Sequence, residues 1–185
     1  MKALFLSAAV AVAATAASSP ALAGSVSIGN STARDCYEAA NNRTADRNSF
    51  YHCNLALDQE GLDARDRAAT LNNRGALYLR SRNYRSAGRD FNAALKFNAN
   101  NAEAWLNMAI VGLQQGGAAE TLPMIEKSLA LNTSRPALAY YSRSIAHERA
   151  GNIRAAYNDL RRAVELAPEW NAPAEDLKRY QVRRR

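Results

Sequence analysis

The sequence predicts an all-α protein assembled from repeated pairs of helices. The chain has 185 residues and is 48% hydrophobic, with alanine prominent and only nine glycines and five prolines. This composition favours packed helices over a sheet or a loop-rich fold. Apolar side chains recur at helical spacing from residue 33 onward. A fixed order of small and aromatic residues then returns at intervals of 34 or 35 residues, which is the pattern of a helical repeat.

Residues 1–23 are predicted to be a secretory signal peptide. They carry one charged side chain, Lys2, then an apolar run over residues 3–17, and they end in the small-residue sequence Ala21-Leu22-Ala23. An uncleaved anchor is the alternative, but the run is short and alanine-rich for a hydrocarbon layer of about 30 Å. The short leader is typical of bacteria and no cysteine follows it, so we expect a soluble periplasmic protein without a lipid-modified terminus.

The mature chain is expected to be basic. The formal net charge is +7, and removal of the leader with Lys2 leaves 23 basic and 17 acidic residues, or +6. Such a balance favours acidic partners or surfaces. Residues 24–32 are small and polar without helical spacing, so we expect a disordered mature N-terminus there.

Residues 33–65 are predicted to form an N-terminal helical hairpin that caps the repeats. Helices are expected over 33–42 and 48–59, with a polar turn between them. Cys36 and Cys53 are equally far from the centre of this turn, so an antiparallel hairpin places them opposite one another. In an oxidising compartment they would form a disulfide that stabilises the fold by about 3 kcal/mol. Two reduced core thiols are the alternative, and the absence of C-x-x-C spacing disfavours a catalytic dithiol.

Three repeats follow, over residues 68–101, 102–135 and 137–170. Leu71 and Trp105 are 34 residues apart, and Trp105 and Tyr140 are 35 apart because the loop 132–136 contains one extra residue. Small residues stand at Gly75, Ala109 and Ser144. They are expected to let the paired helix approach closely while the aromatic side chains fill the core.

This arrangement resembles the tetratricopeptide repeat (TPR) family, whose pattern is W-x2-L-G-x2-Y, then A-x3-F, then P. The first repeat matches at Gly75, Tyr78, Ala87, Phe91 and Ala94, the second at Trp105 and Ala109, and the third at Ala156, Leu160, Ala163 and Pro168. The resemblance implies a right-handed superhelix with a concave groove for a protein partner. Some family members grip a C-terminal carboxylate in the groove, but here only Asn107 occupies a position of that clamp, so that mode is not expected.

Two local features add expectations about the later helices. Pro123 would disrupt a helix interior, so the second helix of the second repeat is expected to begin at residues 121–123. After Pro168, an apolar stripe over residues 174–182 predicts a capping helix within a basic terminal segment, 171–185. The basic tail comprises Lys178, Arg179, Arg183, Arg184 and Arg185. It is either a solvated end or a contact for acidic protein or anionic lipid.

No catalytic or metal-binding pattern is present in the sequence. His52 and His147 are far apart, neither stands in a metal-ligand spacing, and no Gly-rich phosphate loop or G-x-S-x-G turn occurs. We therefore expect no enzyme activity, no cofactor and no metal.

The predicted functional site is the groove, lined by one face of the first helix of each repeat. Helical spacing selects these groove residues: Asn72, Ala76, Leu79, Arg80, Leu106, Asn107, Ile110, Leu113, Gln114, Tyr141, Ile145, Glu148 and Arg149. Many are apolar, which is typical of a binding surface. We expect a helix or peptide of a cell-envelope protein there, with Arg80 and Arg149 contacting acidic residues at its flanks.

Alternatives to this site remain open at the level of the sequence. The chain's own terminal helix or a second copy of the protein would also cover such a groove. Binding of an anionic surface or polymer through the basic tail, or self-association as a structural protein, are the other functions considered. Nucleic acid is not expected as a partner.

Overall fold

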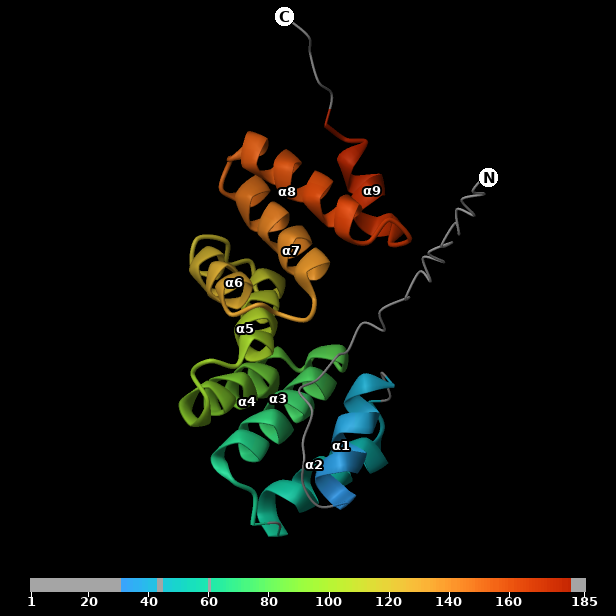
Figure 1. Ribbon diagram of the computed structural model, residues 1–185, viewed down its shortest axis with the longest axis vertical. Helices are drawn as coiled ribbons and strands as arrows, with labels where there is room; N and C mark the ends of the chain where they lie inside the picture. The colour runs from blue at the N-terminus through green and yellow to red at the C-terminus, as the bar shows by residue number, and fades with distance from the viewer. Residues whose placement is uncertain (1–30, 43–44, 60, 181–185) are drawn as a thin grey trace, which may run out of the picture.

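The computed structural model describes residues 31–42, 45–59 and 61–180. The predicted signal peptide, most of the expected disordered N-terminus and Arg183 to Arg185 lie outside these ranges. Within them, antiparallel helix pairs stack one upon the next (Figure 1). The helices are α1 (Ser31–Asn41), α2 (Arg47–Gln59), α3 (Ala64–Arg80), α4 (Tyr84–Phe97), α5 (Ala102–Gln114), α6 (Thr121–Ala130), α7 (Pro136–Arg149), α8 (Ile153–Leu166) and α9 (Asn171–Leu177).

The stack confirms the predicted all-α class. Helices α3 and α4, α5 and α6, and α7 and α8 form the three pairs expected from the repeats, and the hairpin α1–α2 packs on α3. Helices α3, α5 and α7 also contact one another along the array. We call these three the A helices, and the second helices α4, α6 and α8 the B helices.

The helix pairs turn through a shared backbone conformation. Asn83 N–H donates to Tyr78 O (2.8 Å) and Arg82 N–H donates to Leu79 O (3.0 Å), which ends α3 in the Schellman arrangement. This arrangement requires a left-handed residue, here Arg82 with φ 57°. Gly116 (φ 89°) and Gly151 (φ 79°) occupy the same place after α5 and α7.

Polar side chains just before several helices fix where those helices begin. Asp63, Asn83 and Asn101 accept hydrogen bonds from backbone N–H groups three residues later, with distances of 2.8, 3.2 and 3.1 Å. These N-caps satisfy donors that have no partner within the helix. Pro123 lies in the first turn of α6, where its missing N–H is not needed, so the expected start of this helix at 121–123 is confirmed.

Two helix boundaries differ from expectation. Helix α1 begins at Ser31, inside the segment expected to be disordered. The capping helix was expected over 174–182, but α9 begins at Asn171 and ends at Leu177. Beyond Leu177, the N–H groups of Lys178, Arg179 and Tyr180 donate to carbonyls three residues earlier, so the chain tightens into turns and the helix stops.

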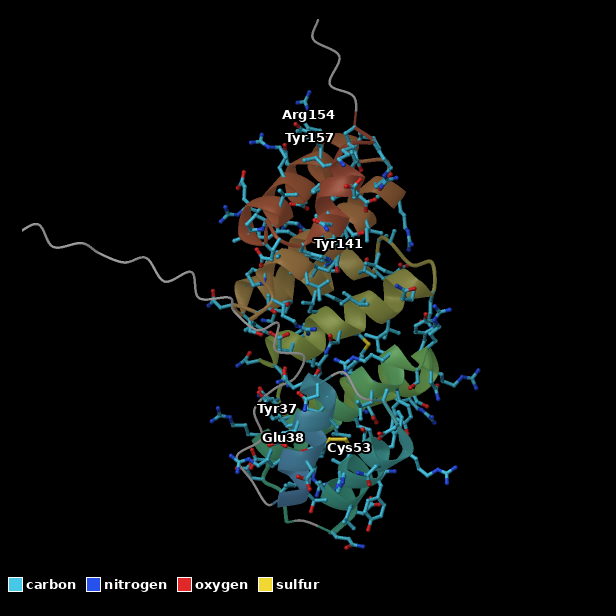
Figure 2. All side chains as sticks on the ribbon, turned by 90° about the vertical axis from the view of Figure 1, so that its right-hand side faces the viewer. Tyr37, Glu38, Cys53, Tyr141, Arg154 and Tyr157 are labelled. Carbon is cyan, nitrogen blue, oxygen red and sulfur yellow. A yellow bond between two sulfur atoms is a disulfide. The ribbon has the colours of Figure 1, made fainter. Side chains whose placement is uncertain are left out.

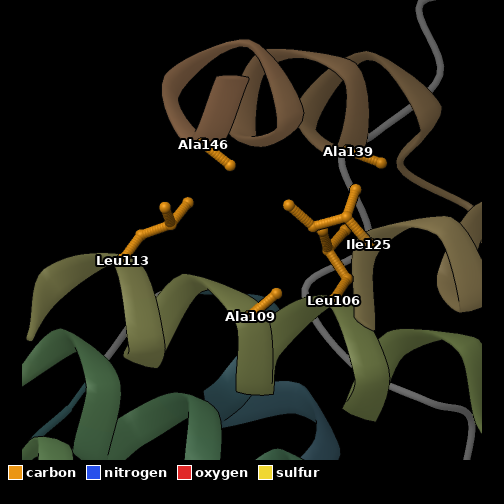
Figure 3. Close-up of a cluster of buried hydrophobic side chains, with 6 residues drawn as sticks. All are labelled: Leu106, Ala109, Leu113, Ile125, Ala139 and Ala146. Carbon is orange, nitrogen blue, oxygen red and sulfur yellow. The ribbon is translucent and has the colours of Figure 1, made fainter. Parts of the chain in front are cut away.

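The core is a chain of small clusters between neighbouring helices. Phe91 of α4 is fully buried against Gly75 of α3, where glycine leaves room for the ring. Leu106, Ala109 and Leu113 of α5 face Ile125 of α6 and the alanines of α7 (Figure 3). In the hairpin, Cys36 and Cys53 form the predicted disulfide, with Cα atoms 4.7 Å apart (Figure 2).

Candidate protein-binding face

Hydrogen bonds between repeats show that the A helices form one continuous face. Asn107 Nδ2 of α5 donates to Asn72 Oδ1 of α3 at 3.0 Å. Arg149 Nη1 at the end of α7 donates to Leu113 O of α5 at 2.6 Å. Tyr141 OH of α7 donates to a carboxylate oxygen of Asp176 in α9 at 2.8 Å. The predicted groove residues of separate repeats are therefore neighbours in space.

Five predicted groove residues are not exposed, which corrects the expectation that they line an open surface. These are Asn72, Ala76, Leu106, Asn107 and Leu113. The A helices approach one another so closely that these positions lie between helices. Leu106 and Leu113 belong to the core cluster of α5, α6 and α7, and the two asparagines bond to each other. Helical spacing did not indicate the depth of each residue.

Helix α9 and the turn after it engage two more of the predicted residues. Besides the bond between Tyr141 and Asp176, Arg179 pairs with Glu148 at 3.2 Å. Burial and the hydrogen bond to Asp176 together raise the pKa of Tyr141 to about 12. The terminal helix thus contacts the last A helix. A terminal helix that covers the groove was one of the alternatives left open by the sequence.

Six predicted residues remain at least partly accessible. We call this set the A-face: Leu79, Arg80, Ile110, Gln114, Ile145 and Arg149. Leu79, Ile110 and Ile145 are half-buried, each resting against the core while part of its side chain meets solvent. Gln114 and Arg149 are exposed beside them. A half-buried aliphatic row with polar ends is suited to an apolar partner surface.

A polar cluster at the joint between the second and third repeats was not anticipated. Glu103 Oε1 accepts hydrogen bonds from the Thr133 hydroxyl (2.7 Å) and the Ser134 backbone N–H (2.7 Å). Its Oε2 accepts from Arg135 Nε at 2.6 Å, and Arg135 Nη2 also donates to Asn107 Oδ1 at 2.8 Å. The only signal in the sequence was the extra residue in the loop 132–136, and this loop supplies all four donors.

The electrostatics of this cluster favour the charged carboxylate. Burial alone raises the pKa of Glu103, but the charge of Arg135 and the hydrogen bonds from the loop outweigh it and hold the pKa below its ordinary value. Glu103 therefore binds the loop as an anion and does not offer its charge to a partner.

Two hollows of the described surface are lined by residues outside the A-face. One is lined by His147, Gly151, Ile153 and their neighbours at the turn from α7 to α8. Another lies on the hairpin between Asp35, Asp46 and His52. Among the described residues, no three His, Cys, Asp or Glu side chains are grouped to hold a metal ion.

Two residues of the predicted basic tail form ion pairs with carboxylates of the same chain. Lys178 pairs with Glu175 at 2.7 Å, and Arg179 pairs with both Glu148 and Asp176. Arg183, Arg184 and Arg185 lie outside the described residues. None of the helices in the described part of the chain is long and apolar enough to cross a membrane.

The repeating pairs, their stacking and the shared face define a tetratricopeptide-type helical repeat fold. The chain is similar to the TPR domain of OM64 from Arabidopsis, with 21% identity and a TM-score of 0.57 over 63% of this chain and 94% of that domain. It is also similar to MamA, from residue 41 to its end, of Desulfovibrio magneticus RS-1, with 20% identity and a TM-score of 0.64 over 80% and 82% of the two chains. No family model and no curated protein matches the sequence. At this identity the likenesses establish the fold.

Proposed function

We propose that the protein is a periplasmic scaffold that binds a helix or peptide of a cell-envelope protein on the A-face. The supporting observation is the row of half-buried Leu79, Ile110 and Ile145 on consecutive A helices. A row of aliphatic side chains presented by a preformed helical scaffold suits the apolar side of an amphipathic segment. Arg149 at its end favours an acidic flank on the partner.

The periplasmic location rests on separate observations. Disulfides such as Cys36–Cys53 form and persist mainly in oxidising compartments, and residues 1–23 have the pattern of a cleaved export signal. Mass spectrometry of the protein from a periplasmic extract tests both. A mature chain beginning at Gly24 with the disulfide intact supports the proposal, and an intact leader or recovery from the cytoplasm contradicts it.

Site-specific crosslinking at an exposed position tests the binding face. A photoreactive residue at exposed Gln114 of the A-face should capture a discrete partner in intact cells. The matched control places the same residue at Asn158, which is exposed on the B helix α8. Capture at 114, lost when Ile145→Ser is added, supports the A-face. Equal capture at both sites, or at Asn158 alone, would overturn it.

A further inference from the structure

Helix α4 and the turn before it carry a row of positive charge that the A-face does not use. Arg85, Arg89 and Lys96 are exposed, and their spacing places them on one side of α4. Arg82 is exposed in the turn between α3 and α4. We call these four residues the basic stripe. The one acidic residue of α4, Asp90, is buried and bonded to Arg74 at 2.7 and 2.9 Å, so it does not neutralise the row.

The charges of the basic stripe are not compensated within the described residues. No carboxylate there lies within ion-pair distance of any of the four, and Arg89 donates only to the hydroxyl of Ser86 at 3.0 Å. On α8 the situation is different, since Arg161 and Arg162 both reach Glu165, at 3.8 and 3.1 Å. The stripe is therefore a concentration of free positive charge and does not belong to a network of surface ion pairs.

The backbone at Arg82 gives a second reason to assign the stripe a role. Arg82 has φ 57°, whereas the equivalent turns after α5 and α7 use Gly116 and Gly151. The left-handed region disfavours residues with a Cβ atom, and glycine is the residue best suited to this position. Arginine does not favour the left-handed backbone of this turn. We therefore attribute its presence here to its charged side chain.

We propose that the basic stripe binds an anionic phospholipid surface. Three of the four residues lie on the B helix α4, the opposite member of the helix pair from the A helix α3 (Figure 1). This proposal does not depend on what the A-face binds.

Charge density and surface chemistry favour lipid over an acidic protein. Each Lys or Arg beside an anionic membrane raises affinity about fivefold, and several act together on one continuous surface. Exposed ion pairs with an acidic peptide contribute between no gain and about fivefold each, with less cooperation. Protein interfaces also depend on a desolvated central anchor, whereas the one exposed residue between Arg89 and Lys96 is the polar Asn92.

Vesicle binding tests the proposal with the full chain. Vesicles of phosphatidylcholine containing one quarter phosphatidylglycerol should bind the protein at low salt, and pure phosphatidylcholine should not. Raising the salt concentration should release it, since exposed charges are screened within about 10 Å at 0.1 M. The variant Arg85→Gln/Arg89→Gln should weaken binding roughly 25-fold, fivefold for each charge. The matched control Arg154→Gln/Arg161→Gln removes the same charge from exposed positions of α8 and should leave binding unchanged.

The variant Arg82→Gly separates binding from folding. It should raise the melting temperature, because glycine relieves the left-handed backbone, while weakening vesicle binding about fivefold. Several outcomes would overturn the proposal: no binding to the anionic vesicles, equal loss in the stripe and control variants, loss only on deletion of residues 183–185, or preference for a polyglutamate peptide over vesicles.

Discussion

Gly75 shows how one residue sets the distance between two helices. A Cβ atom added there would lie 2.5 Å from Cε1 and 2.8 Å from Cδ1 of Phe91, a ring that is fully buried and has no free direction in which to move. Gly75→Ala should therefore lower the free energy of unfolding by about 1–3 kcal/mol, in the range of core overpacking. Urea denaturation of the purified protein measures this.

Gly88 provides the matched control within the same pair of helices. A Cβ atom there would meet Val111 Cγ1 at 3.8 Å, which is ordinary contact, in a helix interior where alanine is preferred. Gly88→Ala should be neutral or stabilise by up to about 1 kcal/mol. Similar losses at the two glycines would show that close approach is not the reason for Gly75.

A second residue-scale device is an arginine–aspartate pair that occurs in the first and third repeats. Arg74 contacts Asp90 through two hydrogen bonds of 2.7 and 2.9 Å, and Arg143 contacts Asp159 through two of 2.8 and 2.7 Å. Both pairs span 16 residues and occupy the same register of their repeats. The second repeat has Met108 and Met124 at this spacing, so the fold accepts an apolar pair there.

The apolar pair in the second repeat predicts that removing one member of the Arg74–Asp90 pair is more harmful than replacing both. Asp90→Ala should cost about 3 kcal/mol or more, because it leaves the guanidinium of Arg74 partly buried without its carboxylate. Arg74→Met/Asp90→Met should recover most of that loss, since two apolar side chains leave no unpaired charge. Thermal and urea unfolding of the single and double variants provide the comparison. A double variant as unstable as the single one would contradict the argument.

At the scale of elements, the α1–α2 hairpin depends on its disulfide. The buried residues of α1 and α2 are mostly small, including Ala33, Ala40 and Ser49, so the pair buries little apolar volume of its own. The bridge closes a loop with a sequence separation of 17. A loop of this size stabilises a fold by about 3 kcal/mol through loss of unfolded-state entropy.

Removal of the bridge should loosen the hairpin before the repeats. In Cys36→Ala/Cys53→Ala, amide hydrogen exchange should accelerate in α1 and α2 while α5 to α8 keep their protection, because contacts in a repeat array are mostly between neighbours. Reduction of the wild-type protein should reproduce this pattern. Uniform acceleration along the chain, or none, would contradict a local role for the bridge.

Some structural features of these elements can be predicted from the sequence, and others cannot. The helix pairs, the disulfide and the start of α6 at Thr121 were predictable because they follow from local spacing, turn residues and proline chemistry. The burial of Leu106 and the bond between Asn72 and Asn107 were not, since they depend on how closely helices from different repeats approach. The depth of a residue is a property of the assembled stack, and one helix in isolation does not determine it.

At the scale of the whole molecule, polar side chains join the repeats across their boundaries. Asn72 of α3 bonds to Asn107 of α5, and Arg135 before α7 bonds to both Asn107 and Glu103. These contacts connect α3 and α5 with the residue that precedes α7, and two apolar clusters also cross the repeat boundaries. We expect this connection to fix the relative positions of Leu79, Ile110 and Ile145, and with them the shape of the A-face.

Glu103 is the acidic centre of that connection, and its ionisation predicts how the array responds to acid. Its pKa is held below its ordinary value of 4.5, so its contribution to stability is complete above that pH and is lost as the pH falls through the lowered pKa. Glu103→Gln should cost about 2–4 kcal/mol at pH 7, where it leaves Arg135 without its charged partner. The difference from wild type should shrink below pH 4.5, as the native carboxylate is protonated. Urea unfolding from pH 7 to pH 3 measures this, with exposed Glu169→Gln as the control expected to follow wild type throughout. A deficit in Glu103→Gln that stays constant over this range would show that the charge of Glu103 does not hold the repeats together.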